Sequence, residues 1–339
     1  MSRRALFALA VLTALTLTAC SNADGAGSAG DEDLASSGPS AGGAAGYPVT
    51  VDNCGTEVTL EAPPERIVTI KSTSTELVLS LGLADRLVGT AFSDGPLPEQ
   101  LAETAADVPV LAERAPSAEV VLAAEPDFVL GGWESNFSAD GAGERAELAE
   151  LGIATYVNPA ACLDEAYQPD PLTFEHVFDD VLQAGELLGA PEAAEELVDA
   201  QRADLEQVQS SSAGLTALWY SSGSDIPYVG GGIGAPQLLL ETIGLRNIMA
   251  DVHESWASGS WEAIAAQNPD VIVLVDSAWN TVEHKIEVLE SNPVTAAMDA
   301  VIDERYLVVP FPASEAGVRS VPAAVDLSDQ LMDLTAQDS

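Results

Sequence analysis

One short sequence unit occurs twice in this chain, half a chain length apart. Residues 117–130 and residues 260–274 both contain a Glu, then Pro-Asp seven residues later, then an apolar run. Glu119 and Glu262 open the two units at an offset of 143 residues. Each unit predicts a short amphipathic helix, a turn and a buried strand. The repetition indicates two lobes of similar build, and clefts between such lobes are common ligand sites.

The first residues are typical of an export signal. Arg3 and Arg4 precede an apolar run from Ala5 to Ala19, which is too short to span a bilayer, and Cys20 follows directly. This order predicts a signal peptide over residues 1–19 and is similar to that of bacterial lipoproteins. An ordinary secretory signal followed by a chance Cys is the alternative. A lipid on Cys20 would anchor the protein to the outer face of the cell membrane without spanning it.

Amino-acid composition and Gly and Pro turn signals divide the rest of the chain. Residues 20–46 are rich in Gly, Ala, Ser and acidic residues, which predicts a flexible tether. About 290 residues remain, enough for two domains of ordinary size. We expect an N-terminal lobe over residues 47–170, a helical segment with an interlobe connector over 171–212, and a C-terminal lobe over 213–339.

The charge of the chain excludes some partners. The formal net charge is −42, with 54 acidic and 12 basic residues. Such a surface repels nucleic acid and anionic lipid, so nucleic acid is not an expected partner. Contact with the membrane is expected only through the lipid on Cys20.

Two cysteines remain after Cys20. Cys54 and Cys162 form an even pair in an exported chain, so we expect a disulfide between them. Two buried free thiols are the alternative. A metal site is disfavoured, because no His or Cys lies at ligand spacing near either residue.

Strand and helix signals alternate along both halves of the chain. A hairpin is expected over 49–60, followed by strands at 66–70, 87–90, 128–130 and 154–157 and, in the second half, at 215–220 and 306–309. Helix signals separate most of them and continue without a strand from Pro171 to Gln209. This alternation predicts an α/β fold with a parallel or mixed sheet in each lobe.

Taken together, these features resemble those of a known family, the substrate-binding proteins of ABC importers, in the branch for ferric siderophores, haem and cobalamin. The resemblance covers residues 47–335 and rests on the order and spacing of short sequence motifs as well as on the motifs themselves. Its motifs are the lipoprotein start, Val51–Gly55, Pro64–Val68, Glu76 before Leu81-Gly82, both Glu…Pro-Asp units and the connecting helix. It implies two Rossmann-like lobes joined by one long rigid α-helix, with the ligand cleft between the lobes.

The same resemblance implies partners. In that family each lobe carries a surface Glu that docks onto Arg residues of the permease dimer, and the matching residues here are Glu119 and Glu262. A carboxylate at the same place on each lobe suits a two-fold symmetric partner. The alternative is that both side chains merely favour the positive ends of their helices. The expected partners are the permease with its ATPase subunits and a small-molecule ligand, and the protein itself is expected to be a monomer.

A narrower resemblance concerns the ligand. Four segments resemble an actinobacterial subgroup that has been proposed to import a deazaflavin coenzyme precursor. These segments are Trp133–Gly141, Trp219–Gly223, Pro227–Gly230 and Pro310–Arg319. A ferric siderophore, or cobalamin or haem, is the alternative ligand class implied by the broader family.

Candidate ligand contacts follow from the strand ends. In open α/β lobes, ligands bind beyond the carboxyl ends of the strands, so the residues just after each strand are the first choice. The residues chosen in this way are Lys71, Ser72, Thr73, Trp133, Glu134, Asn136, Tyr220, Ser221, Tyr228, Trp279, Phe311 and Arg319. Trp256 is added as an aromatic residue in an expected loop.

The basic and aromatic members of this set suggest a chemistry. Lys71 and Arg319 are candidate anion clamps, side chains that could bind an anionic group of the ligand, in a chain with few cations. An exposed loop charge is an equally good interpretation of Lys71. The loop tryptophans offer faces for a flat conjugated ring. Trp219 lies within an apolar strand and is expected in the core, whereas Trp261 fits either role.

Enzyme and cofactor motifs are weak. The loop Gly230–Gly234 before a helix resembles a phosphate cradle, but no Gly-Lys-Ser/Thr follows and a tight turn explains it as well. His176, His253 and His284 do not form a metal or catalytic motif, and no Gly-x-Ser-x-Gly elbow occurs. A secreted hydrolase is therefore the competing class without a motif to support it. No catalytic residue, metal site or cofactor is predicted.

Overall fold

The computed structural model describes residues 46–336, all within the second of two compact units, Gly43–Ser339. The predicted signal peptide, Cys20 and nearly all of the predicted tether lie outside the described residues. Between residues 46 and 336 no helix has the length and apolar character needed to cross a membrane.

The N-terminal lobe is built on a five-stranded parallel sheet with the order β5-β4-β3-β6-β7. Its strands are β3 (Ile67–Ile70), β4 (Leu87–Ala91), β5 (Val110–Ala112), β6 (Phe128–Gly131) and β7 (Ala154–Val157). Its helices are α1 (Ser72–Ser80), α2 (Glu99–Thr104), α3 (Ala118–Ala123) and α4 (Arg145–Glu150). The expected hairpin is present as the antiparallel pair β1 (Val49–Asn53) and β2 (Thr56–Leu60).

The C-terminal lobe is built on a mixed sheet with the order β11-β9-β8-β12-β13, and β10 pairs with β8. Its strands are β8 (Thr216–Ser222), β9 (Tyr228–Gly230), β10 (Arg246–Asn247), β11 (Trp256–Ser258), β12 (Val271–Asp276) and β13 (Tyr306–Pro310). Its helices are α7 (Ala235–Thr242), α8 (Trp261–Gln267), α9 (Val282–Ser291), α10 (Asp299–Ile302) and α11 (Ser320–Ala336). The antiparallel strands β9 and β11 were not predicted, because three residues each give too short a pattern to detect.

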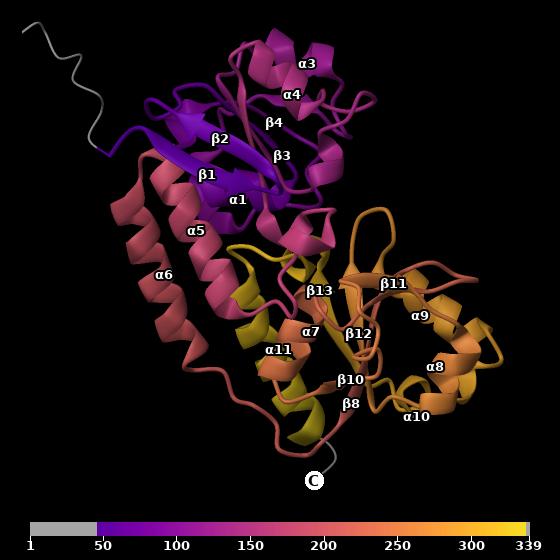
Figure 1. Ribbon diagram of the computed structural model, residues 1–339. Helices are drawn as coiled ribbons and strands as arrows, with labels where there is room; N and C mark the ends of the chain where they lie inside the picture. Colours follow the sequence, from indigo (N-terminus) through magenta and orange to yellow (C-terminus); the bar gives the residue numbers. More distant parts are fainter. Residues whose placement is uncertain (1–45, 337–339) are drawn as a thin grey trace, which may run out of the picture. The chain divides into compact units, whose positions relative to one another are not determined.

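Two helices of equal length lie between the sheets in the sequence. Figure 1 shows α5 (Phe174–Leu188) and α6 (Pro191–Leu205) side by side along both lobes, and α6 leads into β8. Gly189 turns the chain between them with a φ of 71°. A single apolar cluster continues from the N-terminal lobe through Phe178 of α5 and Val198 of α6 to Leu327 of α11. The α/β class and the two-lobed build predicted from the sequence are confirmed.

The repeated Pro-Asp pair has a structural reason. In the first unit the Asp127 carboxylate accepts hydrogen bonds from the backbone N–H groups of Glu65 and Arg66, at 2.8 and 3.0 Å. In the second, the Asp270 carboxylate accepts from the backbone N–H and hydroxyl of Thr216, both at 2.7 Å. Each Asp therefore joins the start of its own strand to the start of the neighbouring central strand, β3 or β8.

Candidate functional site

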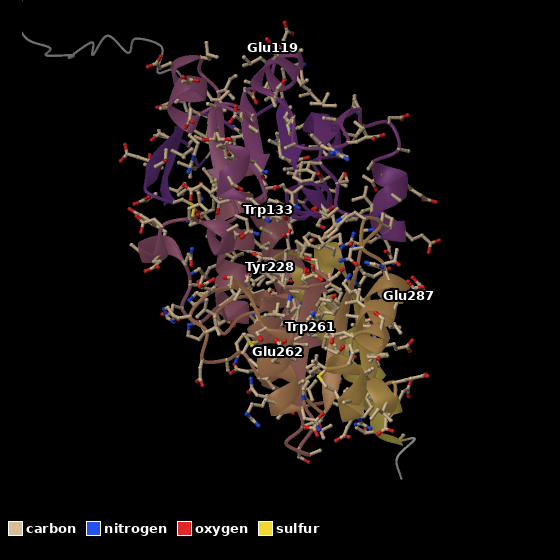
Figure 2. The ribbon with its side chains drawn as sticks, turned by 90° about the vertical axis from the view of Figure 1, so that its right-hand side faces the viewer. Glu119, Trp133, Tyr228, Trp261, Glu262 and Glu287 are labelled. Carbon is tan, nitrogen blue, oxygen red and sulfur yellow. A yellow bond between two sulfur atoms is a disulfide. The ribbon has the colours of Figure 1, made fainter. Side chains whose placement is uncertain are left out.

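Two adjoining cavities lie between the lobes. The larger has a volume of about 420 Å³ and the smaller about 340 Å³. Both are lined by Trp133, which follows β6 of the N-terminal lobe, and by Tyr228, Trp256 and Glu315 of the C-terminal lobe. Figure 2 shows Trp133 and Tyr228 in the middle of the molecule, between Glu119 and Glu262. The cleft expected between the lobes is therefore a feature of the structure.

Aromatic side chains form much of the cleft wall. The rings of Tyr228 and Trp256 stack with centroids 5.9 Å apart and an interplanar angle of 14°. Trp279 is 62 % exposed and meets the ring of Phe311 edge-on at 5.7 Å. These four rings and that of Trp133, together with Ser221, Ser222 and Glu315, line the smaller cavity. Such a surface offers broad faces to a flat, conjugated ligand.

Lys71 lies behind this wall rather than on it. Its side chain is fully buried and its ammonium forms an ion pair with the Asp94 carboxylate. The ammonium also lies 3.4 Å from the centre of the Trp133 ring, with Phe92 and Phe311 at 4.7 and 5.0 Å. Its backbone has a φ of 81°, a strained value for a residue other than Gly. Lys71 lines neither cleft cavity.

Asp94 places a negative charge at the start of α1, next to Lys71. Its carboxylate accepts a hydrogen bond from the backbone N–H of Ser72 at the start of α1, at 3.3 Å. The Ser72 hydroxyl in turn accepts from the backbone N–H of Asp94, at 2.9 Å. The positive helix terminus and the Lys71 ammonium are thus both neutralised from within the protein.

Arg319 also has an internal partner. Its guanidinium forms a two-point ion pair with the buried Glu76 carboxylate and donates to the carbonyl of Pro96 at 2.8 Å. Burial raises the pKa of Glu76, and the hydrogen bond and charge of Arg319 oppose this shift. Since Glu76 belongs to α1 and Arg319 precedes α11, the pair joins the two lobes. Like Lys71, Arg319 does not line either cleft cavity.

Glu315 is a site residue that the sequence reasoning did not select. It lies between the predicted contacts Phe311 and Arg319, but it is one acidic residue among 54 and no spacing distinguishes it. One carboxylate oxygen accepts a hydrogen bond from the Trp133 indole N–H across the lobes, at 2.7 Å. Burial raises the pKa of Glu315 to about 7, while the positive charge of Lys71 opposes this shift and the negative charge of Asp94 adds to it.

The predicted contacts fall into two groups. The cavity linings include Trp133, Ser221, Tyr228, Trp256, Trp279 and Phe311. Others support the site from behind: the Asn136 amide oxygen accepts from the backbone N–H of Trp133 at 3.0 Å, and the buried Tyr220 hydroxyl donates to the Gly223 carbonyl at 2.8 Å. Thr73 borders a separate internal cavity of about 10 Å³. The expectation that Trp219 belongs to the core is confirmed.

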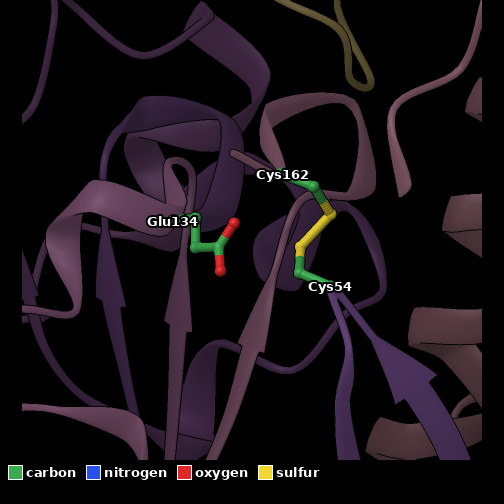
Figure 3. Close-up of side chains that lie close together, drawn as sticks. All are labelled: Cys54, Glu134 and Cys162. Atoms are coloured by element: carbon green, nitrogen blue, oxygen red, sulfur yellow. A yellow bond between two sulfur atoms is a disulfide. The ribbon is translucent and has the colours of Figure 1, made fainter. Parts of the chain in front are cut away.

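The predicted disulfide is confirmed, and it lies beside the cleft. Cys54, in the β1–β2 turn, is bonded to Cys162, whose segment lines the larger cavity. Figure 3 shows the Glu134 carboxylate next to this bridge. Because each sulfur is bonded to the other, this cluster offers no thiolate to a metal. Glu134 instead accepts a hydrogen bond from the backbone N–H of Leu163, at 2.5 Å, and so fastens the same segment.

The glycine loop before α7 serves close packing. The backbone N–H groups of Gly231 and Gly232 donate to the carbonyls of Ser255 and Val252, at 3.0 and 2.8 Å. A Cβ at either glycine would lie 2.1 Å from a carbonyl oxygen of the facing segment. Two amides of this loop are therefore engaged within the protein, which is compatible with the tight-turn interpretation.

Glu119 and Glu262 occupy equivalent local positions. Both are exposed second residues of a helix, α3 or α8, and both helices begin after a Ser whose hydroxyl accepts from the backbone, at 3.4 Å in each case. A hydrogen bond from the Ser260 hydroxyl lowers the pKa of Glu262. The local repeat seen in the sequence is thus repeated in three dimensions.

The fold and the cleft together define a class: a two-lobed α/β protein that holds a solute between its lobes. The sequence matches the periplasmic binding protein family over residues 67–312, and the chain belongs to that family. The resemblance drawn from sequence motifs is confirmed at this level. Its relatives are solute-binding proteins and not enzymes, which sets the hydrolase alternative aside.

Individual relatives are distant but cover most of the chain. An uncharacterised ABC transporter substrate-binding lipoprotein of Bacillus subtilis strain 168, YvrC, is 28 % identical over 84 % of this chain and 86 % of its own length. The vitamin B12-binding protein of Photorhabdus laumondii is 24 % identical over 81 % of this chain and 90 % of its own. The solved structure of an ABC-type Fe3+-hydroxamate transport system protein from Saccharomonospora viridis is 27 % identical, with a TM-score of 0.72, over 84 % of this chain and 99 % of that one.

Proposed function

We propose that this protein is a lipid-anchored, extracytoplasmic solute-binding protein that delivers a deazaflavin coenzyme precursor to an ABC importer. The observation that carries the ligand class is the aromatic cleft wall, in which Tyr228, Trp256 and Trp279 surround a cavity of about 340 Å³. That volume lies in the range of small-ligand sites. Family membership supports the transport role, and the motifs at Trp133–Gly141 and Pro310–Arg319 support the deazaflavin assignment.

The anchor and tether belong to the same proposal. The relative YvrC is described as a lipoprotein, and Cys20 follows a signal of the matching kind. A lipid on Cys20 with a tether to residue 46 would confine the binding domain near its membrane partner and raise the effective concentration of the pair.

The ligand assignment predicts saturable binding that changes the tryptophan fluorescence of the protein. We expect the deazaflavin precursor to quench the fluorescence of the full chain, because Trp133, Trp256 and Trp279 line the cavities. A titration with the precursor, a ferric hydroxamate complex and cobalamin measures this. Trp256→Leu should lose most of the quenching, whereas the core variant Trp219→Phe should keep it. Quenching by another ligand and not by the precursor would contradict the assignment.

A ferric hydroxamate is the second candidate, and the charge of the larger cavity favours it. Glu165, Asp170, Glu254 and Glu315 line this cavity, with His253 paired to Asp170 at 3.0 Å. With Lys71 and Arg319 occupied by internal carboxylates, the lining disfavours a strongly anionic complex and accepts a neutral or cationic one. The relative from Saccharomonospora viridis, named for Fe3+-hydroxamate transport, has the same fold.

The docking proposal predicts a loss of transport without a loss of binding. Reversing both charges, Glu119→Arg with Glu262→Arg, should reduce ligand uptake by cells at least about tenfold, because like charges would then face the Arg residues expected on the permease. Ligand affinity measured by titration should stay unchanged, since both side chains are exposed and lie outside the cavity linings.

A matched control separates docking from helix capping. Glu283 of α9 is also an exposed second residue of a helix, after the capping residue Thr281, and Glu287 lies one turn further. Figure 2 shows Glu287 apart from both docking candidates. Glu283→Arg with Glu287→Arg makes the same change in charge and should leave uptake intact. Equal uptake by the two double variants would remove the docking role.

A further inference from the structure

Glu315 is placed as a recognition residue would be. The side chain is only 9 % exposed, yet it lines both cleft cavities. Its first carboxylate oxygen, Oε1, is held by the Trp133 indole N–H. Its second, Oε2, is buried and has no hydrogen-bond partner among the described residues. A buried acceptor without a partner is costly, and in a native protein such a group calls for an explanation such as a bound water, an ion or a functional role.

The nearby cations do not satisfy this oxygen. The Lys71 ammonium forms its ion pair with Asp94, and the Arg319 guanidinium with Glu76. Each cation is therefore matched by one carboxylate, and the negative charge of Glu315 is left over at the wall of the cleft.

We propose that Glu315 is the polar specificity residue of this cleft and that it selects flat ligands whose edge presents an N–H or O–H donor. The aromatic rings bind the faces of the ligand, and the carboxylate accepts the hydrogen bond from its edge. This inference rests on the proposed binding function and adds the chemical feature by which the ligand is recognised. A deazaflavin ring carries such a donor at its imide nitrogen.

Glu315→Gln tests the proposal because it reverses the polarity of the group at the cavity. The Trp133 N–H requires an acceptor, so the amide oxygen takes the place of Oε1 and the amide NH₂ takes the place of Oε2. The contact that positions Trp133 is kept, while the buried, unpartnered acceptor of a residue that lines both cavities becomes a donor. A purely structural role for Glu315 would leave binding unaffected by this change.

The expected result is a loss of affinity specific to this position. Calorimetric titration of the full chain with the deazaflavin precursor should show binding to Glu315→Gln weakened by about 10- to 100-fold, the usual worth of a hydrogen bond to a charged group. Glu283→Gln is the matched control, because Glu283 is exposed and lies outside both cavity linings. It removes the same charge and should change affinity by less than about threefold.

The pH dependence of binding gives an independent readout. Burial raises the pKa of Glu315 to about 7, and the negative charge of Asp94 adds to this shift. The positive charge of Lys71 and the hydrogen bond from Trp133 oppose it. Only the carboxylate offers its full acceptor strength, so affinity should rise with pH through 7 and fall below it. Glu283→Gln should keep this slope, and Glu315→Gln should lose it although it leaves the His253–Asp170 pair of the larger cavity in place.

The outcomes separate this inference from the proposed function. If wild type binds the precursor and Glu315→Gln binds it equally well with the same pH slope, the role of Glu315 is overturned and the proposed function stands. If only a ferric hydroxamate binds, the deazaflavin assignment fails, and the same two variants with that complex decide the role of Glu315. If the precursor, the hydroxamate and cobalamin all fail to bind wild type, both proposals are overturned.

Discussion

Lys71→Met should lower the free energy of unfolding by about 3–5 kcal/mol, the usual result of removing one partner of a buried ion pair. The side chains of Lys71 and Asp94 are 0 % and 4 % exposed, so water cannot replace the lost ammonium. Methionine has a similar length and can contact the same aromatic rings, so the packing loss is small and the uncompensated Asp94 carboxylate dominates. Urea unfolding at pH 7 and fixed salt measures the change.

The only other lysine provides the control. Lys285 is buried to the same extent, but its ammonium donates to the Asn280 carbonyl at 2.6 Å, and burial lowers its pKa to about 8. Lys285→Met leaves no buried carboxylate behind and should cost about 1 kcal/mol. The double variant Lys71→Met with Asp94→Asn should recover much of the loss, because it removes both charges. Equal losses in the two lysine variants would show that the ion pair contributes no more than an ordinary hydrogen bond.

The features that the sequence predicted well are local in the chain. The two Glu…Pro-Asp units predicted two lobes of similar build, because an amphipathic helix, a turn and a buried strand each have a short-range sequence signature. The Cys54–Cys162 bridge followed from a count of cysteines in an exported chain. Trp133 and Tyr228, which line the cavities, were selected by the rule that ligands bind beyond strand ends, and this rule needs only the position of each strand.

The features that the sequence did not predict depend on pairs far apart in the chain. Arg319 was a candidate anion clamp, and Lys71 was either such a clamp or an exposed loop charge, because the partners of both side chains could not be seen. Arg319 meets Glu76 across 243 residues, and Trp133 meets Glu315 across 182. In a chain with 54 acidic residues, any cation has many candidate partners, and only the fold selects one. Both cations are paired inside the protein, and neither this pairing nor the position of Glu315 in the cleft could be seen in the sequence.

The disulfide should contribute about as much stability as the ion pair, by a different route. It closes a loop with a sequence separation of 108 residues, which on the chain-entropy model stabilises the folded state by about 4.7 kcal/mol. Cys54→Ser with Cys162→Ser should lower the free energy of unfolding by about that amount. The bridge acts mainly on the unfolded chain, so the folded core should keep its spectrum while the urea midpoint falls.

Reduction of the wild-type protein supplies the control for this variant. Dithiothreitol should lower the wild-type midpoint to that of the double serine variant and should leave the variant itself unchanged. The segment after Cys162 lines the larger cavity and would then lose its covalent link to the β1–β2 turn, leaving noncovalent contacts such as the Glu134–Leu163 hydrogen bond. Ligand affinity should therefore fall together with stability, and adding Glu134→Gln should lower it further. A serine variant with wild-type stability and affinity would show that the neighbouring contacts alone fix this wall of the cleft.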